Sequence, residues 1–311
     1  MAAGASVTRF SAADAAYFEL LHGLAASLRA AEGARQLALS ILDLGLEAAQ
    51  RQRLEALGAT LVAPGWDLDF PGRARLPEHY KAMAARPYLP QHFPGYEVYL
   101  WIDADAWVQD AAALDIFIAA ARAGRLAIVP EIDRGYWTIH KRPKIWGQNQ
   151  RAFAWAYGAR AGYRLGRNAI LNVGAFALRG DAPHWRLWAA AHARALQRPR
   201  LFRKPALANQ GFFLSEQTAL NHVVYAEGAP ATFLPAYCNW FCGKGTPLFD
   251  EARGLLVEPQ APHQPLGLVH LAGAGMKERV WRLETLAGGT VETRLTYEAA
   301  RALARRGASR A

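Results

Sequence analysis

Short apolar runs alternate along the first half of the chain with stretches of helical periodicity. Strand-compatible apolar runs lie at 7–12, 36–46, 59–64, 97–106 and 125–131. The stretches between them at 14–28, 47–58 and 111–124 are typical of helices, the first of them through the three- and four-residue spacing of Tyr17, Leu20, Leu21, Leu24 and Leu28. This alternation predicts an α/β fold, in which helices cover both faces of a mostly parallel sheet.

Two carboxylates follow the fourth of these predicted strands. In YLWIDADAWVQD, residues 99–110, Asp103 and Asp105 come directly after an apolar run. Ligands of open α/β sheets bind beyond the carboxyl ends of the strands. Chain order alone therefore puts this pair at the expected ligand edge.

Three interpretations of the pair stay open at this point. Two oxygen ligands from one turn suit Mg²⁺ or Mn²⁺, which take further ligands from substrate phosphates. A phosphatase of the haloacid-dehalogenase type would use one Asp as nucleophile and the other as general acid. That chemistry expects Thr or Val where Trp107 stands and a later acidic cluster, in which Trp185 of GDAPHW would occupy an acidic position. The third interpretation is an ordinary turn, as we expect for the Asp67 and Asp69 pair, which no long apolar run precedes.

Further polar residues occur where later predicted elements begin or end. The apolar strand predicted at 168–181 carries Asn172, whose amide suits sugar hydroxyls, and Gly174, which permits close approach to the backbone. The helix predicted at 215–225 has Glu216 and Gln217 in its first turn, where Ser215 as N-cap is the structural alternative. A further strand ends at His270, before a glycine-rich loop and Lys277 that suit a phosphate.

Composition narrows the class of protein. The net charge of +10 favours phosphate-bearing partners. However, the chain has no recognition-helix or aromatic RNA-binding signature, so we expect no nucleic-acid partner. Cys238 and Cys242 lack the second ligand pair of a zinc site and are expected to be ordinary thiols. With no membrane-length apolar run and no signal-peptide pattern, we expect a cytoplasmic protein with at most peripheral contact with a membrane, such as the inner membrane face.

Taken together, these stretches resemble glycosyltransferase family 8, the retaining GT-A enzymes that include glycogenin and bacterial lipopolysaccharide galactosyltransferases. The resemblance covers roughly residues 7–281. It rests on AADAAY, SILDLGL, ARPYLP, YLWIDADAWV, LNVGAFAL, EQTALN, PAYCNW and VHLAGAGMK, in that order. It implies a single GT-A domain over 1–311, with its core at 7–281 and a C-terminal extension at 282–311 that ends in a basic tail.

The resemblance also implies a role for each matching residue. Asp14 would hold uracil, Tyr17 would stack on it, and the metal, Mn²⁺ or Mg²⁺, would be bound by Asp103, Asp105 and His270. Glu216 and Gln217 would be the catalytic residues at the donor sugar, and Asn239 would lie on the acceptor side. The remaining donor contacts would be Ala12, Arg86, Ala104, Asn172, Gly174, Gly273, Gly275 and Lys277.

Two departures from the family pattern affect these expectations. Glu216 replaces an Asp, and we expect the longer side chain to bear on sugar preference. The loop from His270 to Lys277 has one residue too many, so either Gly273 or Gly275 could be the equivalent glycine.

The resemblance implies a metal-dependent transferase that moves a hexose from UDP-glucose or UDP-galactose to a hydroxyl of an unknown glycan, lipid-linked or protein acceptor. A GT-A-like protein that binds a nucleotide-sugar or glycan without turnover is the main alternative, followed by the phosphatase.

Overall fold

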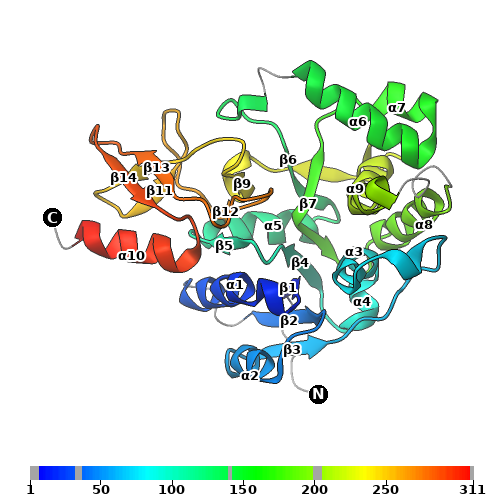
Figure 1. Cartoon of the computed structure of the whole chain (residues 1–311), viewed down its shortest axis with the longest axis horizontal. Coiled ribbons are helices and arrows are strands. Elements are labelled where there is room, and N and C mark those ends of the chain that lie inside the picture. The colour runs from blue at the N-terminus through cyan, green and yellow to red at the C-terminus, as the bar shows by residue number, and fades with distance from the viewer. Residues whose placement is uncertain (1–6, 32–36, 139–141, 199–204, 309–311) are drawn as a thin grey trace.

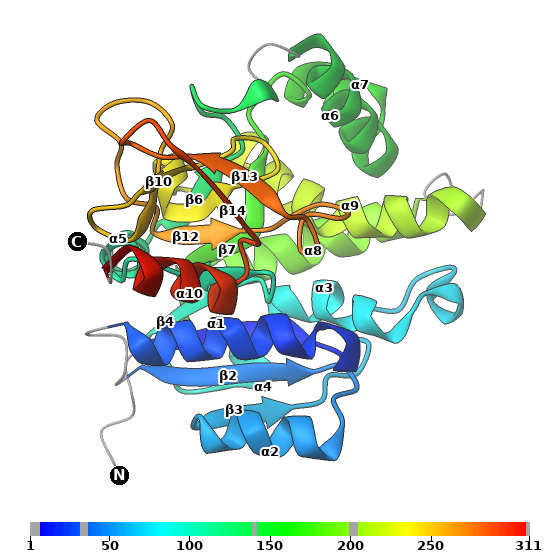
Figure 2. The ribbon, with the colours of Figure 1, turned by 60° about the vertical axis from the view of Figure 1, so that its left-hand side comes forward.

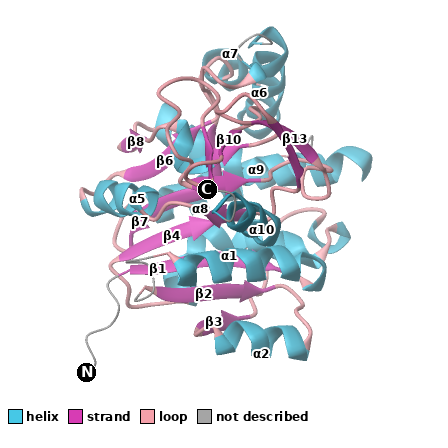
Figure 3. Ribbon diagram, turned by 90° about the vertical axis from the view of Figure 1, so that its left-hand side faces the viewer, coloured by secondary structure: helices cyan, strands magenta, loops and turns pink. Residues whose placement is uncertain are grey.

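The computed structural model describes residues 7–31, 37–138, 142–198 and 205–308. A seven-stranded sheet in the order β3-β2-β1-β4-β7-β6-β8 forms its centre, and Figure 3 shows the strands stacked in that order. Its strands are β1 (Val7–Ala13), β2 (Ala38–Asp43), β3 (Ala59–Val62), β4 (Val98–Ile102), β6 (Leu126–Pro130), β7 (Leu171–Arg179) and β8 (Ala231–Phe233). The predicted mixed, mostly parallel α/β sheet is confirmed.

One strand runs against the others. β7 is antiparallel to both of its neighbours, β4 and β6, whereas the remaining neighbouring pairs are parallel. The amino end of β7 therefore lies at the edge where the parallel strands have their carboxyl ends. This reversal brings Asn172, near the start of β7, to the same edge as Asp103, which follows β4.

Helices cover both faces of the sheet, and β4 shows why (Figure 1). Its five residues are all buried: Val98, Leu100 and Ile102 join one core cluster, and Tyr99 and Trp101 join the opposite one. Full burial of each such side chain contributes about 1.5–3 kcal/mol. The first cluster includes residues of α1 (Phe18–Ala30), α2 (Ala48–Ala56) and α5 (Ala112–Arg122). The second includes residues of α3 (Lys81–Ala85), α4 (Leu89–His92), α8 (His184–Leu196) and α9 (Pro205–Tyr225).

A small second sheet joins the middle of the chain to its C-terminal part. β12 (Leu268–His270) lies between β5 (Ala106–Val108) and β9 (Trp240–Phe241). β12 is antiparallel to β5, and His270 is paired with Ala106. Because β5 follows the Asp103–Asp105 turn at once, this pairing sets the end of β12 beside the carboxylates.

The predicted C-terminal extension packs into the body of the molecule. Its elements are β13 (Trp281–Glu284), β14 (Thr290–Thr293) and α10 (Tyr297–Ala308), which follow the hairpin of β10 (Leu248–Asp250) and β11 (Leu255–Val257). Leu283 and Leu295 are buried in one cluster with Trp107, Trp240 and Trp281. The exposed Arg301 and Arg305 lie on α10, in the stretch predicted as a basic tail.

Some elements differ from the sequence-based expectation. The predicted strand 97–106 is interrupted at Asp103–Asp105, and the helix predicted at 215–225 begins at Pro205. Ser215 therefore lies inside α9, and its interpretation as an N-cap is wrong. Two helices were not expected from the sequence, namely α6 (Arg142–Tyr157) and α7 (Ala159–Leu165), which stand away from the body in Figure 2.

Short 3₁₀ helices occupy several connections, namely Ala15–Tyr17, Arg73–Arg75, Glu78–Tyr80, Arg86–Tyr88 and Ala236–Asn239. Within the described ranges, no helix combines the length and the apolar character that crossing a membrane requires.

Candidate active site

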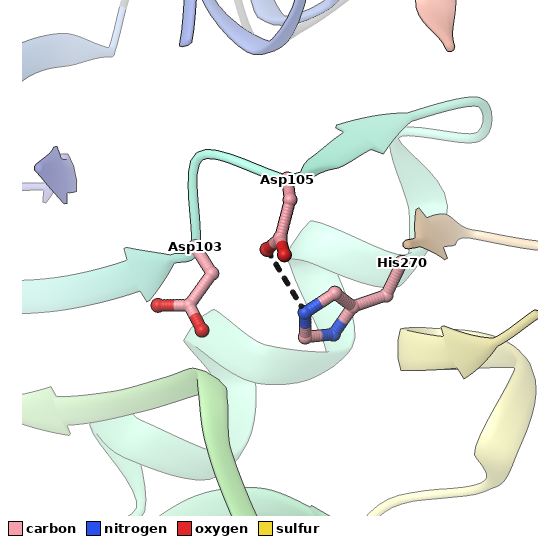
Figure 4. Close-up of side chains that lie close together, drawn as sticks. All are labelled: Asp103, Asp105 and His270. Carbon is pink, nitrogen blue, oxygen red and sulfur yellow. Dashed lines mark ion pairs between the residues drawn. The ribbon is translucent and has the colours of Figure 1, made fainter. Parts of the chain in front are cut away.

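The two carboxylates lie in the tight turn between β4 and β5. The backbone N–H of Asp103 donates to the carbonyl of Gly174 on β7 at 2.7 Å, and that of Ala106 donates back to Asp103 at 3.0 Å. These bonds stop β4 and point both side chains beyond the sheet edge. Figure 4 shows Asp103 and Asp105 converging with His270 from the end of β12.

His270 completes a compact group of three potential metal ligands. Its Nε2 lies 3.2 Å from Oδ1 of Asp105, and one ligand atom from each of Asp103, Asp105 and His270 lies within 4.8 Å of the other two. Carboxylate oxygen and imidazole nitrogen together suit Mn²⁺. The residues present therefore fit a divalent ion.

Asn239 fixes the orientation of the imidazole. His270 Nδ1 lies 3.0 Å from Oδ1 of Asn239, which can only accept, so Nδ1 carries the hydrogen. This leaves Nε2 to face the carboxylates, as a metal-binding histidine requires. Asn239 itself is fully buried and does not line the cavity. The family resemblance put Asn239 on the acceptor side; in the structure its side chain contacts His270 from behind the cavity.

Asp105 and His270 shift each other's pKa in opposite directions. Burial would raise the pKa of Asp105, but His270 and Lys277 hold it well below its usual range. Burial would lower the pKa of His270, but Asp105 raises it above the ordinary 6.5. Without a metal, both shifts favour a charged carboxylate beside a protonated imidazole.

Arg86 connects Asp103 to Glu216 on α9. The buried guanidinium donates to both Glu216 oxygens at 3.0 and 3.1 Å, and it also pairs with Asp103. It lies 4.4 Å from the ring of Trp101, whose indole N–H donates to Asp103. Burial raises the pKa of Glu216 to about 7, although Arg86 opposes the shift. Glu216 is 1% exposed, so its carboxylate is shielded from water, and both of its oxygens are bonded to Arg86.

Lys277 and Tyr17 form the opposite side of the site. Lys277 Nζ lies 3.2 Å from Oδ2 of Asp105 and donates to the Tyr17 hydroxyl at 2.7 Å. Tyr17 is 42% exposed, so it does not belong to the apolar core stripe of α1. Asp14 caps the preceding 3₁₀ turn by accepting from the Tyr17 N–H at 3.1 Å.

A polar network lies across the start of β7. Asn172 donates to Glu131 at 2.8 Å and to Gln217 Oε1 at 3.3 Å, and Gln217 Oε1 also accepts from the N–H of Val173. The amide nitrogen of Gln217 makes no hydrogen bond within the described part of the chain and is free to donate to a ligand. Lys244 pairs with the other oxygen of Glu131.

These groups line one cavity of about 730 Å³. Among the predicted site residues, it is lined by Ala12, Asp14, Tyr17, Arg86, Asp103, Ala104, Asp105, Asn172, Gly174, Glu216, Gln217, His270, Gly273 and Lys277. Gly275 does not line it, so Gly273 is the loop glycine that faces the cavity. A smaller hollow of about 210 Å³ between α1 and α10 is mainly apolar, with Arg301 its one charged described lining residue.

Several lining residues were not predicted. Glu131 and Lys244 add an ion pair, Trp101 and Phe241 add aromatic surface, and His79 stands near Asp14. The sequence pattern could have predicted Glu131, because this residue directly follows the apolar run of β6 just as Asp103 follows that of β4. Lys244 lies in a turn without any such pattern.

Three other predictions concern residues near or outside the site. Asp67 and Asp69 lie in a loop and pair with His92 and Arg73, which confirms the expected turn. Cys238 and Cys242 are buried free thiols, as expected. Asp181, which the phosphatase interpretation needs, pairs with Arg179 just after the far end of β7, away from Asp103.

Gly174 leaves room for the metal-ligand group. A Cβ there would lie 2.5 Å from His270 Cε1, 2.7 Å from Asn172 Oδ1 and 2.8 Å from Asp103 Oδ2. Gly174→Ala must therefore displace these side chains. We expect Mn²⁺ affinity to fall about 10–100-fold while the protein stays folded, as titration calorimetry and circular dichroism would measure.

Gly65→Ala is the matched control, because a Cβ on this loop glycine meets nothing within 4 Å. Unchanged Mn²⁺ affinity in Gly174→Ala would show that the ion binds elsewhere.

Comparison with known proteins identifies the fold. No protein-family model and no curated protein matches the chain. Among solved structures, galactosyltransferase LgtC with donor and acceptor sugar analogues matches with a TM-score of 0.52 and 14% identity, over 96% of this chain and 95% of that one. An active-site mutant of LgtC matches with a TM-score of 0.50 and 15% identity, over 86% and 87% of the two chains.

The glycosyltransferase GlyE of Streptococcus pneumoniae TIGR4 matches with a TM-score of 0.50 and 14% identity. The match covers 97% of this chain and 63% of GlyE. The chain therefore has the GT-A fold of nucleotide-diphospho-sugar transferases. Membership of family 8 stays a prediction.

Proposed function

We propose that this protein is a metal-dependent glycosyltransferase of family 8 that moves a hexose from a nucleotide-sugar, UDP-glucose or UDP-galactose, to an acceptor hydroxyl with retention. One observation carries the proposal: Asp103, Asp105 and His270 gather in a large cavity at the ligand edge of a GT-A sheet. LgtC, which shares this fold, is a galactosyltransferase and was solved with donor and acceptor sugar analogues.

The three ligands would hold Mn²⁺ or Mg²⁺. When bound, the ion would act as a Lewis acid on the diphosphate leaving group. Lys277 would add a point charge beside the same phosphates, exchanging its contact with Asp105 for one with the donor. Gly273, at φ 111°, exposes backbone to the donor at a conformation that other residues rarely adopt.

The nucleoside would lie between the end of β1 and the Lys277 loop. Tyr17 is half-exposed there and offers a ring face to the base. One oxygen of Asp14 caps the 3₁₀ turn, and the other is 3.8 Å from His79 and within reach of uracil.

The transferred sugar and the acceptor would meet at Gln217. Its unpaired amide nitrogen can donate to a sugar oxygen, whereas its oxygen is held by Asn172 and Val173. An amide is a weak nucleophile, so Gln217 positions and polarises. Glu216 is buried and bonded to Arg86, so it would set the position of Asp103 through that arginine. Its direct role at the sugar would then be smaller than the family resemblance implied.

A metal-dependent assay tests the proposal. With UDP-glucose or UDP-galactose and Mn²⁺, we expect release of UDP that stops on chelation of the metal. Donor-dependent thermal stabilisation without any UDP release would favour the non-catalytic binding protein. Release of phosphate from an aryl phosphate would favour the phosphatase. Failure of every nucleotide-sugar to bind in Mn²⁺ would refute the proposal.

Tyr17 gives a prediction specific to the nucleoside. Tyr17→Ala is expected to weaken UDP binding about 5–150-fold, the range of about 1–3 kcal/mol for stacking of a base on an aromatic ring. UDP and the UDP-sugar should lose affinity equally, as fluorescence or calorimetric titration would measure.

Tyr17→Phe is the control, since it keeps the ring and removes the hydroxyl bonded to Lys277. A loss of thermal stability with unchanged UDP affinity would instead make Tyr17 a packing residue.

A further inference from the structure

Positive charge is concentrated in one part of the chain. Residues 134–215 contain fifteen Lys and Arg residues and a single acidic residue, Asp181. The rest of the chain contains 21 Lys and Arg against 25 Asp and Glu. The overall charge of +10 therefore comes from this segment, which includes α6, α7 and α8.

The described side chains of α7 arrange this charge around an aromatic ring. Arg160, Tyr163, Arg164 and Arg167 follow i, i+3, i+4 and i+7 spacing, so they share one side of the helix and its extension. All four are exposed, and Tyr163 is 71% exposed. The Arg167 guanidinium lies 5.9 Å from the Tyr163 ring centre.

α6 also carries a row of exposed polar side chains. Lys144, Gln148 and Arg151, at i, i+4 and i+7, share one side of the helix and are exposed. Across the described ranges, none of the basic residues of α6 and α7 with described side chains forms an ion pair. We call Lys144, Arg151, Arg160, Tyr163, Arg164 and Arg167 the α6–α7 basic surface.

This surface lies on an outer part of the molecule that is joined to the candidate active site. α6 packs against α8 and α9, and α9 carries Leu214 and Gln217, which line the cavity. Figure 2 shows α6, α7 and α9 extending on the side toward which the arrows of β2 and β3 point. That is the side of the sheet's ligand edge.

We infer that the α6–α7 basic surface docks this protein on an anionic phospholipid bilayer. Unpaired Lys and Arg side chains are attracted to anionic headgroups, and their long stems lie along the interface. An exposed ring such as that of Tyr163 sits at the same depth, with one end apolar and the other hydrated. A nucleic acid would also account for the charge, but the sequence carries no recognition-helix or aromatic RNA-binding signature. Docking here brings the cavity close to the membrane surface.

Vesicle co-sedimentation of the full chain tests the inference. We expect binding to vesicles of phosphatidylcholine mixed with phosphatidylglycerol, no binding to phosphatidylcholine alone, and loss of binding as salt rises. Each basic residue near an anionic surface strengthens binding about fivefold, so Arg160→Glu/Arg164→Glu should weaken it by at least about 25-fold. Tyr163→Ser should weaken it less.

Arg282→Glu/Arg294→Glu is the matched control. It makes the same charge change at two other exposed arginines, Arg282 on β13 and Arg294 directly after β14. This variant should keep vesicle binding. An equal loss in both variants would reduce the effect to net charge and overturn the inference. So would the absence of binding to anionic vesicles, or retention of binding in Arg160→Glu/Arg164→Glu.

A gel-shift assay with double-stranded DNA tests whether the same surface binds a nucleic acid instead. DNA binding that depends on Arg160 and Arg164, without vesicle binding, would make this a nucleic-acid surface and overturn the inference. Vesicle binding requires neither donor nor metal. Its result is therefore independent of the proposed transferase activity, and Arg160→Glu/Arg164→Glu should bind UDP with Mn²⁺ as the unmodified protein does.

Discussion

Asp105→Ala is expected to abolish metal-dependent nucleotide-sugar binding and to lower UDP release by about three orders of magnitude. A bound metal contributes several kcal/mol of transition-state stabilisation, and each 1.36 kcal/mol corresponds to about a tenfold change in rate. Asp105 contacts both His270 and Lys277, so its removal takes away one ligand oxygen and the partner of both side chains. Asp105→Asn keeps the shape and should lose nearly as much activity.

The fold should survive the substitution. Without Asp105, the buried imidazole of His270 can become neutral, because Asp105 is the main cause of its raised pKa. Circular dichroism and thermal unfolding would check this. Asp69→Ala is the control, because Asp69 belongs to the other Asp-x-Asp pair and forms only a surface ion pair with Arg73. If both variants behave alike, Asp103 and Asp105 are not the metal pair.

His270→Ala is expected to lower Mn²⁺ affinity and turnover together by about 100-fold or more, since even loss of a residue behind a metal ligand costs 10–100-fold. UDP binding without metal should change little. His92→Ala, which removes the 3.0 Å contact with Asp67 in the β3–α3 connection, is the control and should keep full metal affinity. Turnover that falls while Mn²⁺ affinity stays unchanged would remove His270 from the ligand set.

The pH dependence of Mn²⁺ binding follows from the same contact. Imidazole binds a metal only when neutral, so proton and metal compete for Nε2. Asp105 raises the pKa of His270 in the metal-free protein, so the loss of affinity should begin above pH 6.5 as pH falls. Affinity should then drop about tenfold per pH unit until other ligands titrate. Calorimetric titrations across this range would measure it, and His270→Ala should remove the dependence.

The sequence predicted those parts of the site that follow directly from strand ends. Asp103 and Asp105 come after a buried strand, and a parallel α/β sheet leaves one edge for ligands. His270 likewise ends an apolar run. For the two carboxylates, local pattern and chain order were sufficient to predict the ligand edge. The family resemblance implied that His270 joins them, and the pairing of β12 with β5 supplies the contact.

Other features depend on contacts that no local pattern encodes. β7 runs antiparallel to β4 and β6, and this direction places Asn172 at the ligand edge. The direction depends on tertiary pairing and not on the sequence of the strand itself. Asn239 was assigned through the family resemblance alone, and it is tertiary packing that buries it behind His270. Glu216 resembles a sugar-binding acid, but the buried Arg86 accounts for its carboxylate.

Hydrophobic periodicity could not predict α6 and α7. α6 contains Gly147 and many polar residues, and α7 is only seven residues long, so neither has a wide apolar stripe. Their helical structure depends on packing of α6 against α8 and α9. The local sequence therefore did not predict the surface that we infer to meet the membrane.

The most direct test of the central claim is a crystal structure with Mn²⁺ and UDP, phased so that anomalous scattering locates manganese. We expect one anomalous peak bound by Asp103, Asp105 and His270 Nε2, with the diphosphate between the ion and Lys277 and the uracil against Tyr17. Manganese bound elsewhere, or His270 turned away from the ion, would show that these three residues are not the metal site.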